Sequence, residues 1–249
     1  MVGLGHLTDS VVWHDVECGG YEADLELWRT LAADANGPIL EIGCGTGRVA
    51  LDLAARGFDV AALDSDAALV GALVERARAR GVAVDAAVGD ARSLSLARRD
   101  FALVVAPMQV VQLMGGSDGR AAMLASVRDH LRDGGRFAAA LADPFDGVPA
   151  ADAGPPLPDV REQDGWVFSS TPVAVRSEPG GTAIDRLRQA VSPDGRLDES
   201  MTSIVLDAVD AADLEAEGER AGFRTLPRRA VPATGDYVGS AVVVLEVAR

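Results

Sequence analysis

The sequence contains no lysine, so each of its 23 basic residues is an arginine. Enzymes that form a Schiff base with a carbonyl substrate need a lysine amine for that step. Mechanisms of this kind are therefore excluded. The excess of arginine and alanine is explained most simply by a GC-rich genome.

Cysteine and histidine are almost as rare. The two cysteines, Cys18 and Cys44, are too few for a disulfide framework and lack the spacing of a zinc site. The three histidines are scattered at His6, His14 and His130. We therefore expect no metal site, and we interpret Cys44 as a small packed residue and not as a nucleophile.

Positive charge and long apolar runs are scarce as well. The net charge is −15, whereas nucleic-acid-binding proteins present basic surfaces, so we expect no nucleic-acid partner. No window holds the roughly 18 uninterrupted apolar residues of a membrane span. The N-terminal stretch "MVGLGHLTDSVVWHDVE" also lacks the cationic start and apolar centre of a signal peptide. These absences predict a cytoplasmic protein without a membrane partner.

What the sequence does contain is an alternation of short apolar runs with amphipathic stretches. The expected strands cover residues 39–42, 59–64, 82–88, 101–106 and 136–141, and the expected helices cover residues 21–34, 48–57, 66–81 and 119–135. Strands that alternate with helices of this length are typical of a doubly wound α/β fold with a mainly parallel sheet. A helix at 211–223 and strands at 224–231 and 240–249 complete a predicted sheet of seven strands.

The pattern changes after residue 146. Residues 146–159 are rich in proline and alanine and are expected to form a loop. The turn sequences "SEPGG" and "SPDG" then separate three extended segments, at 166–175, 182–191 and 197–209. Extended segments joined by tight turns predict a small antiparallel insertion after the fifth strand.

The stretch "ILEIGCGTGR" places glycines 43, 45 and 47 directly after the first strand. Ligands of doubly wound sheets bind beyond the carboxyl ends of the strands, and glycines let a ligand lie against bare backbone. A dinucleotide site would need Gly-x-Gly-x-x-Gly, but Arg48 stands at the third glycine position. No Gly-Lys-Ser/Thr follows either, so a P-loop is also excluded.

Acidic residues accompany this loop. Asp64 closes the second strand, about twenty residues after the glycines, where a carboxylate can accept both hydroxyls of a ribose. Asp90 follows the third strand. Glu41 lies inside the first strand, where an unpaired acid is costly unless a cation or a hydrogen-bond donor meets it. Three acids favour a cofactor with a positively charged part.

These motifs resemble those of a known family. The stretches "ILEIGCGTGRVALDLAARGFDVAALDSD", "VGDAR", "FALVVAPMQVVQLM" and "LRDGGRF" are similar to successive motifs of class I S-adenosylmethionine-dependent methyltransferases, over roughly residues 37–141. The stretches "YEADLELW" and "ATGDYVGSAVVVLEV" resemble the small-molecule branch with an N-terminal helical cap. The resemblance implies one methyltransferase domain over 1–249, divided into a cap (1–36), a cofactor-binding core (37–145), a loop and antiparallel lid (146–209), and a closing helix and strands (210–249).

The resemblance also implies contacts with S-adenosylmethionine. The methionine part would be surrounded by Glu41, Gly43, Cys44, Gly45 and Gly47. Asp64 would hold the ribose, while Ser65, Asp90 and Ala91 would border the adenine. The segment from Ala106 through Met108 to Gln109 would run beneath the sulfonium. Tyr21 either touches the cofactor or only packs.

The implied function is methyl transfer to O, N or C of a small-molecule acceptor, mainly by proximity and orientation. The alternative is an S-adenosylmethionine-binding protein of the same fold with a non-methylating reaction or a non-enzymatic role. The fourth strand ends in "APMQ" and not in the Asn/Asp-Pro-Pro-Tyr/Phe element of methylases that act on amino groups of nucleic acids. A monomer and a homodimer are both compatible with the sequence.

No catalytic residue is identified by the sequence. The polar groups expected near the acceptor are His14, Tyr21, Gln109, Gln112 and Asp143. Only His14 has an ordinary pKa near neutrality, so it is the candidate general base. An exposed, ordinary histidine is nevertheless the simpler interpretation, and a mechanism without an essential base is preferred.

Overall fold

The computed structural model describes residues 9–142, 157–234 and 237–248 of the chain. The larger of its two sheets contains β1 (Ile39–Ile42), β2 (Val60–Asp64), β3 (Asp85–Val88), β4 (Phe101–Ala106), β5 (Leu131–Leu141), β10 (Phe223–Val231) and β11 (Ser240–Val247). The smaller sheet contains β6 (Asp159–Gln163), β7 (Trp166–Glu178), β8 (Gly181–Val191) and β9 (Leu197–Asp207). The helices are α1 (Ser10–Cys18), α2 (Leu25–Ala35), α3 (Arg48–Ala55), α4 (Ala67–Arg80), α5 (Ser117–His130) and α6 (Ala211–Arg220), with short 3-10 helices η2 (Ala91–Ser93) and η3 (Val110–Leu113).

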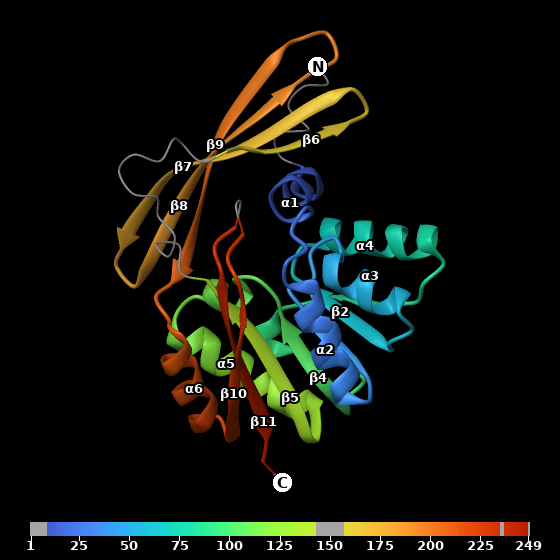
Figure 1. Ribbon diagram of the computed structural model, residues 1–249, viewed down its shortest axis with the longest axis vertical. Coiled ribbons are helices and arrows are strands. Elements are labelled where there is room, and N and C mark those ends of the chain that lie inside the picture. The colour runs from blue at the N-terminus through green and yellow to red at the C-terminus, as the bar shows by residue number, and fades with distance from the viewer. Residues whose placement is uncertain (1–8, 143–156, 235–236, 249) are drawn as a thin grey trace.

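The larger sheet has seven strands in the order β10-β11-β5-β4-β1-β2-β3 (Figure 1). Strands β1 to β5 pair in parallel, and β11 runs antiparallel to both of its neighbours. The doubly wound, mainly parallel sheet predicted from the sequence is therefore confirmed. The carboxyl ends of β1, β2, β3 and β4 lie at one edge of this sheet, which is where such folds bind ligands.

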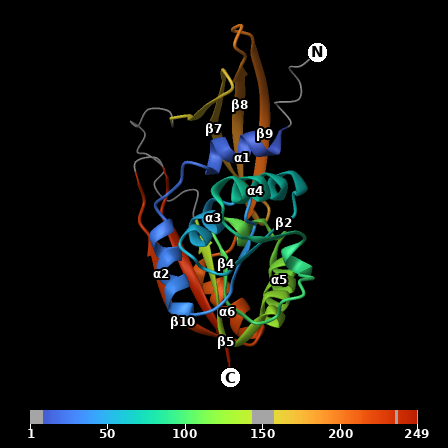
Figure 2. The ribbon, with the colours of Figure 1, turned by 90° about the vertical axis from the view of Figure 1, so that its right-hand side faces the viewer.

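Two hydrophobic cores cover the two faces of the sheet. Side chains of α5 and α6, such as Leu124 and Leu214, pack on one face together with Leu40 and Ile42 of β1. The helices α2, α3 and α4 pack on the other face, where Trp28 is fully buried. Figure 2 shows α2 and α5 on opposite sides of the sheet. Strands covered on both faces are apolar throughout, which explains the uninterrupted runs in the sequence.

The smaller sheet is antiparallel, in the order β6-β7-β8-β9, and follows β5 in the chain. It is the insertion expected from the turn signals, with β6 as an additional strand that the sequence did not indicate. In Figure 1 this sheet lies above the larger one, and α1 lies between it and α4. Contacts of α1 with β6, β7 and α4 support this placement.

The structure corrects the expected end of the helix over 119–135 and describes only part of the expected loop over 146–159. The helix expected over 119–135 is α5, which begins at Ser117 and ends at His130, because Leu131 is already extended and pairs with Phe101 of β4. The last two residues of the expected helix, Gly134 and Gly135, lie inside β5, next to an irregularity in its register with β4. Most of the loop expected over 146–159 lies outside the described residues, as does Asp143.

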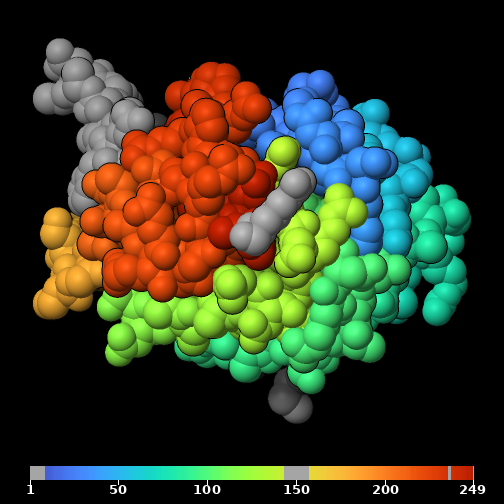
Figure 3. All heavy atoms as spheres, turned by 90° about the horizontal axis from the view of Figure 1, so that it is seen from below, coloured from blue at the N-terminus to red at the C-terminus, as the bar shows by residue number. Residues whose placement is uncertain are grey.

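Segments from both ends of the chain lie side by side. In the view from below, the blue segment that contains α2 lies beside the orange-red C-terminal segment (Figure 3). Residues of α2, β10 and β11 share one core cluster, which explains this arrangement. Among the described residues, no helix is both long enough and apolar enough to cross a membrane.

Candidate active site

A cavity of about 360 Å³ lies at the carboxyl ends of β1, β2, β3 and β4. Residues of β1 and β2, the segments that directly follow β3 and β4, and residues of α1, α3, η2 and η3 form its wall. The lining residues are His14, Cys18, Glu41, Gly43, Cys44, Arg48, Leu63, Asp64, Ser65, Gly89, Asp90, Ala91, Arg92, Pro107, Met108, Gln109, Val110, Leu113 and Met114. The cavity is thus located where the fold predicts a ligand.

The glycine loop needs each of its three glycines. Gly43, Gly45 and Gly47 all have positive φ, at +66°, +53° and +93°, in the region that favours glycine. Neighbours also occupy the positions that side chains would take. A Cβ at Gly43 would lie 2.5 Å from Val110, and one at Gly45 would lie 2.0 Å from the Nε2 atom of His14. The loop therefore packs closely between η3 and α1.

Asp64 ties this loop to the end of β2. Its Oδ2 atom accepts a hydrogen bond of 2.8 Å from the backbone N–H of Gly45, and its Oδ1 atom accepts one of 3.0 Å from the backbone N–H of Asp66. Each carboxylate oxygen can accept further hydrogen bonds. Asp64 lines the cavity, so it can receive ligand hydroxyls while it holds the loop.

Glu41 is the unusual group of the cavity. Its side chain is 2% exposed, and its Oε2 atom has no hydrogen-bond partner among the described residues. Burial raises the pKa of Glu41 to about 8, although the charge of Arg48 and a hydrogen bond from the Ala50 backbone act in the opposite direction. A buried carboxyl group with one free oxygen is costly unless a ligand supplies a donor.

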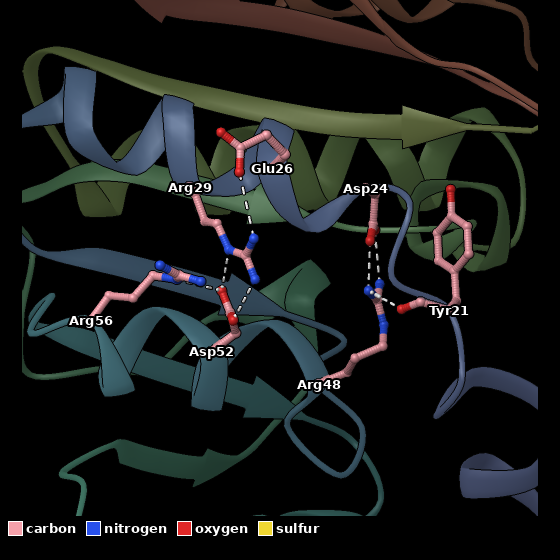
Figure 4. Close-up of polar contacts among 7 residues, drawn as sticks. All are labelled: Tyr21, Asp24, Glu26, Arg29, Arg48, Asp52 and Arg56. Carbon is pink, nitrogen blue, oxygen red and sulfur yellow. Dashed lines mark hydrogen bonds and ion pairs between the residues drawn. The ribbon is translucent and has the colours of Figure 1, made fainter.

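Arg48 does not supply that donor, because it is occupied elsewhere. Its two terminal nitrogens reach Asp24 at 2.5 and 2.8 Å, and one of them also donates to the carbonyl oxygen of Tyr21 at 2.8 Å. Figure 4 shows this bidentate pair, in which the carboxylate belongs to Asp24, the residue directly before α2. The guanidinium carbon lies 5.1 Å from the centre of the Tyr21 ring. Arg48 is thereby neutralised, and the Oε2 atom of Glu41 keeps no partner among the described residues.

His14 is placed differently from the expected exposed histidine. It lies on α1, is half-buried, lines the cavity and points its Nε2 atom at Gly45. Burial lowers the pKa of His14 below its ordinary 6.5, while the nearby carboxylates of Asp15 and Asp64 oppose this shift. The simpler interpretation is therefore wrong, because α1 is packed on the glycine loop and not exposed to solvent.

Most of the residues proposed for the cofactor meet in this one cavity. Those that line it are Glu41, Gly43, Cys44, Asp64, Ser65, Asp90, Ala91 and Met108. Those outside its lining are Tyr21, Gly45, Gly47 and Ala106. Tyr21 packs 4.8 Å from the ring of Tyr237 and beside Arg48, so its structural contacts are with protein groups. Gly45 packs against His14, and Gly47 packs against Leu73 and Leu51.

Three cavity residues carry features that the sequence could not show. Met108 has a φ of +57°, a conformation that costs free energy for a residue other than glycine and occurs preferentially at functional sites. Burial raises the pKa of the Cys44 thiol far above its ordinary value, which agrees with a packed residue. The Asp90 carboxylate is already paired with Arg92 at 2.7 Å, and this pairing lowers the pKa of Asp90.

A second cavity, of about 950 Å³, shares a wall with the first. The short helix η3 contributes to both, because Val110 and Leu113 line the first cavity and Gln112 lines the second. The amide of Gln112 is fixed, because its oxygen accepts from the N–H of Ala142 at 3.0 Å and its nitrogen donates to the carbonyl of Ala142 at 2.9 Å. Residues of the smaller sheet, Thr182 and Leu206, also line this cavity.

Comparison with known proteins agrees with the geometry. The family model described as a methyltransferase domain matches residues 39–135, from the glycine-loop strand to the start of β5. Residues 39–135 thus carry a methyltransferase domain. No curated protein sequence matches the chain.

Solved structures share the fold of this methyltransferase over almost its whole length. The CcbJ methyltransferase from Streptomyces caelestis is 22% identical, covers 97% of each chain and has a TM-score of 0.72. The sugar N-methyltransferase KedS8 from a Streptoalloteichus species is 17% identical, covers 96% of this chain and 92% of its own, and has a TM-score of 0.74. The amino pentose methyltransferase CalS10 from Micromonospora echinaspora, solved with S-adenosylmethionine, is 19% identical, covers 94% of this chain and 96% of its own, and has a TM-score of 0.70.

The cofactor of this methyltransferase is S-adenosylmethionine, and the first cavity fits it. The free oxygen of Glu41 requires a donor, and the amino-acid end of the cofactor carries an ammonium group. The bare face of the glycine loop leaves room beside it. Among the described residues, no group of three or more histidine, cysteine or acidic side chains is arranged to hold a metal ion.

Proposed function

We propose that this methyltransferase transfers the methyl group of S-adenosylmethionine to a small-molecule acceptor, and that the acceptor atom is the nitrogen of an amine. The observation that carries the proposal is the buried carboxyl group of Glu41, with an unpaired oxygen beside the glycine loop at the cavity. When bound, the cofactor supplies a methyl group on a positively charged sulfur that is already activated for transfer.

The residues of the chain bind and orient. Glu41 receives the ammonium group of the cofactor, and Asp64 receives its ribose hydroxyls while it holds Gly45. Ser65, Asp90 and Ala91 border the adenine. Reaction then depends on holding donor and acceptor in contact in a space that excludes water, an effect that accounts for large rate accelerations without any residue taking a proton.

The acceptor is assigned to the second cavity. Residues of η3 line both cavities, and Thr182 and Leu206 of the smaller sheet line the second. The fixed amide of Gln112 and the end of β5 form its floor, so the lid determines the shape that an acceptor must have. The unit needed for this reaction comprises the cap, the core, the lid and the closing segment, so the chain acts as a single domain.

An amine is the first acceptor to test for two reasons. Two of the similar structures are described as a sugar N-methyltransferase and an amino pentose methyltransferase. In addition, the net charge of −15 attracts cationic ligands and repels anionic ones. The same charge disfavours nucleic acid and anionic membranes as partners, and we propose a cytoplasmic enzyme. Both a monomer and a homodimer are compatible with this proposal.

The experiment is a product assay with matched acceptor pairs. Amino sugars are incubated with S-adenosylmethionine beside sugars that carry a hydroxyl in place of the amine, and mass spectrometry detects methylated product together with S-adenosylhomocysteine. We expect product from amino sugars only, and loss of that product in Glu41→Gln. Product only from the hydroxyl sugars would contradict the amine assignment. Cofactor binding without any methylated product would favour the non-methylating alternative.

A further inference from the structure

Helix α1 contacts the smaller sheet with one side and the glycine loop with the other. On the sheet side, Trp13 packs edge-on against Phe168 at 5.7 Å, and Arg188 pairs with Glu17 at 2.7 Å. On the loop side, His14 and Asp15 reach the residues after Gly43. The helix is therefore held from both sides, and its loop-facing residues have fixed positions.

Asp15 is the anchor on the loop side. It is 4% exposed and receives both terminal nitrogens of Arg76 from α4, at 2.8 and 2.5 Å. The hydroxyl of Thr46 donates to the same carboxylate at 2.8 Å, and Arg161 of the smaller sheet lies 3.4 Å away. Burial acts to raise the pKa of Asp15, but the hydrogen bonds from Arg76 and Thr46 outweigh it and lower that pKa. Asp15 is thus a charged acceptor at neutral pH.

This anchor fixes the tautomer of His14. A hydroxyl has one hydrogen, and Thr46 gives its hydrogen to Asp15, so Thr46 can only accept from His14. The Nδ1 atom of His14 lies 3.3 Å from the Thr46 hydroxyl oxygen and must therefore carry a hydrogen. In a neutral ring the Nε2 atom is then a bare acceptor. No described residue donates to it.

The position of Nε2 indicates what it accepts from. The Nε2 atom lies next to Gly45, 2.0 Å from the position that a Cβ atom would occupy there. The carboxylate of Asp64 accepts a hydrogen bond from the backbone N–H of the same glycine. His14 lines the first cavity and not the second. It is therefore on the cofactor side of η3, away from the wall assigned to the acceptor, and it is poorly placed to take a proton from an acceptor.

We propose that His14 is a cofactor-binding residue, whose Nε2 atom accepts a hydrogen bond from a ribose hydroxyl of S-adenosylmethionine, with Thr46 and Asp15 as positioning residues. The inference rests on the proposed function. It replaces a catalytic role for His14 with a binding role, and it explains why the loop has glycine at position 45: any side chain there would displace the imidazole.

The test is calorimetric binding of two ligands, S-adenosylhomocysteine and 5′-methylthioadenosine, the second of which keeps the ribose but lacks the amino-acid end. His14→Phe keeps a ring and removes both nitrogens, and His14→Ala removes the ring. Val11→Ala truncates a side chain on the same helix outside the cavity and is the control. We expect both His14 variants to bind both ligands about five- to tenfold more weakly, which corresponds to the loss of one hydrogen bond. We expect Val11→Ala to change neither affinity.

A pH series separates the hydrogen bond from packing. Protonation of Nε2 removes its acceptor lone pair, so the wild type should lose affinity as the pH falls through the pKa of His14, which burial lowers below 6.5, and His14→Phe should lack that loss. The charged groups that surround the ring, Asp15, Asp64, Arg48 and Arg76, are common to both proteins and cancel in the comparison. Thr46→Val should weaken binding in the wild type and have no further effect in His14→Phe.

The outcomes distinguish this inference from the proposed function. If the wild type binds neither ligand, the proposed function fails. If the wild type binds and His14→Phe binds equally well with the same pH profile, or if the loss is confined to S-adenosylhomocysteine, the ribose contact of His14 is wrong while the function stands. At saturating cofactor, kcat of His14→Phe should fall by less than tenfold, whereas a loss of about a hundredfold or more would restore the general-base role.

Discussion

Replacing Glu41 by glutamine should make the cofactor-free protein more resistant to unfolding at alkaline pH. The folded protein raises the pKa of Glu41 from 4.5 to about 8, because the carboxyl group is buried. The folded state therefore binds the proton more tightly than the unfolded chain does. The resulting stabilisation is complete below about pH 4.5 and is lost as the pH rises through 8, so the wild type should weaken across this interval.

The magnitude follows from the width of the interval. At about 1.4 kcal/mol for each tenfold change in proton affinity, a rise from 4.5 to about 8 corresponds to at most about 5 kcal/mol. Whole domains are stabilised by roughly 5–15 kcal/mol, so this is a large share. Glutamine keeps the shape of the side chain and has no proton to lose. The difference in unfolding free energy between Glu41→Gln and wild type should therefore grow by about 2–4 kcal/mol from pH 5 to pH 9.

Urea denaturation followed by circular dichroism, at several pH values, measures this difference. Glu26→Gln is the control, because the Glu26 side chain is 82% exposed and its replacement should leave the pH profile unchanged. With saturating S-adenosylhomocysteine the advantage of Glu41→Gln should shrink by about 1.4–2.7 kcal/mol, since loss of a hydrogen bond between charged groups weakens binding by roughly ten- to a hundredfold. A difference between Glu41→Gln and wild type that stays constant with pH would refute the reasoning, because Glu41 would then be charged and paired in the free protein.

Three further changes test the remaining contacts. Asp64→Ala should weaken the binding of S-adenosylhomocysteine several-fold to a hundredfold, or by about 1–3 kcal/mol, as measured by calorimetry. An unchanged affinity would contradict the assignment of Asp64 to the ribose. Gly45→Ala should lower the free energy of unfolding by about 2 kcal/mol or more, because it combines a positive φ with a clash against His14. The additional change His14→Ala should recover part of that loss. Strict additivity of the two changes in unfolding free energy would show that the imidazole does not occupy this space. Replacing residues 166–209 by a short linker should abolish acceptor turnover while part of the cofactor binding survives, and persistent turnover would show that the smaller sheet serves assembly instead.

The architecture was predictable because it depends on local patterns. Buried parallel strands are uniformly apolar, and the helices between them carry one apolar side, so their order along the chain defines a doubly wound sheet. The glycine loop and Asp64 were found in the same way, since both must follow strands. Where the prediction failed, the signal was weak. Helix α1 has only nine residues, and β6 ("DVREQ") is a polar edge strand whose pairing with β7 depends on tertiary contacts.

The finer features of the site depend on contacts between distant segments. His14 is half-buried only because Trp13 reaches Phe168, more than 150 positions away in the chain, and the same packing places Asp15 beside Thr46. The free oxygen of Glu41 results from the pairing of Arg48 with Asp24, which no spacing rule predicts. A sequence can show that an acid lies in a strand, but only the packed structure shows which of its neighbours are already occupied.

The double attachment of α1 has a thermodynamic consequence. Arg188 of the smaller sheet contacts Glu17 of this helix, and Thr46 of the glycine loop contacts His14 and Asp15, only about one turn away. An acceptor that holds the smaller sheet against α1 would also hold His14 against the loop, so the two ligands would share one ordering step. Linkage then requires reciprocity: the factor by which a bound acceptor tightens the cofactor must equal the factor by which the cofactor tightens the acceptor.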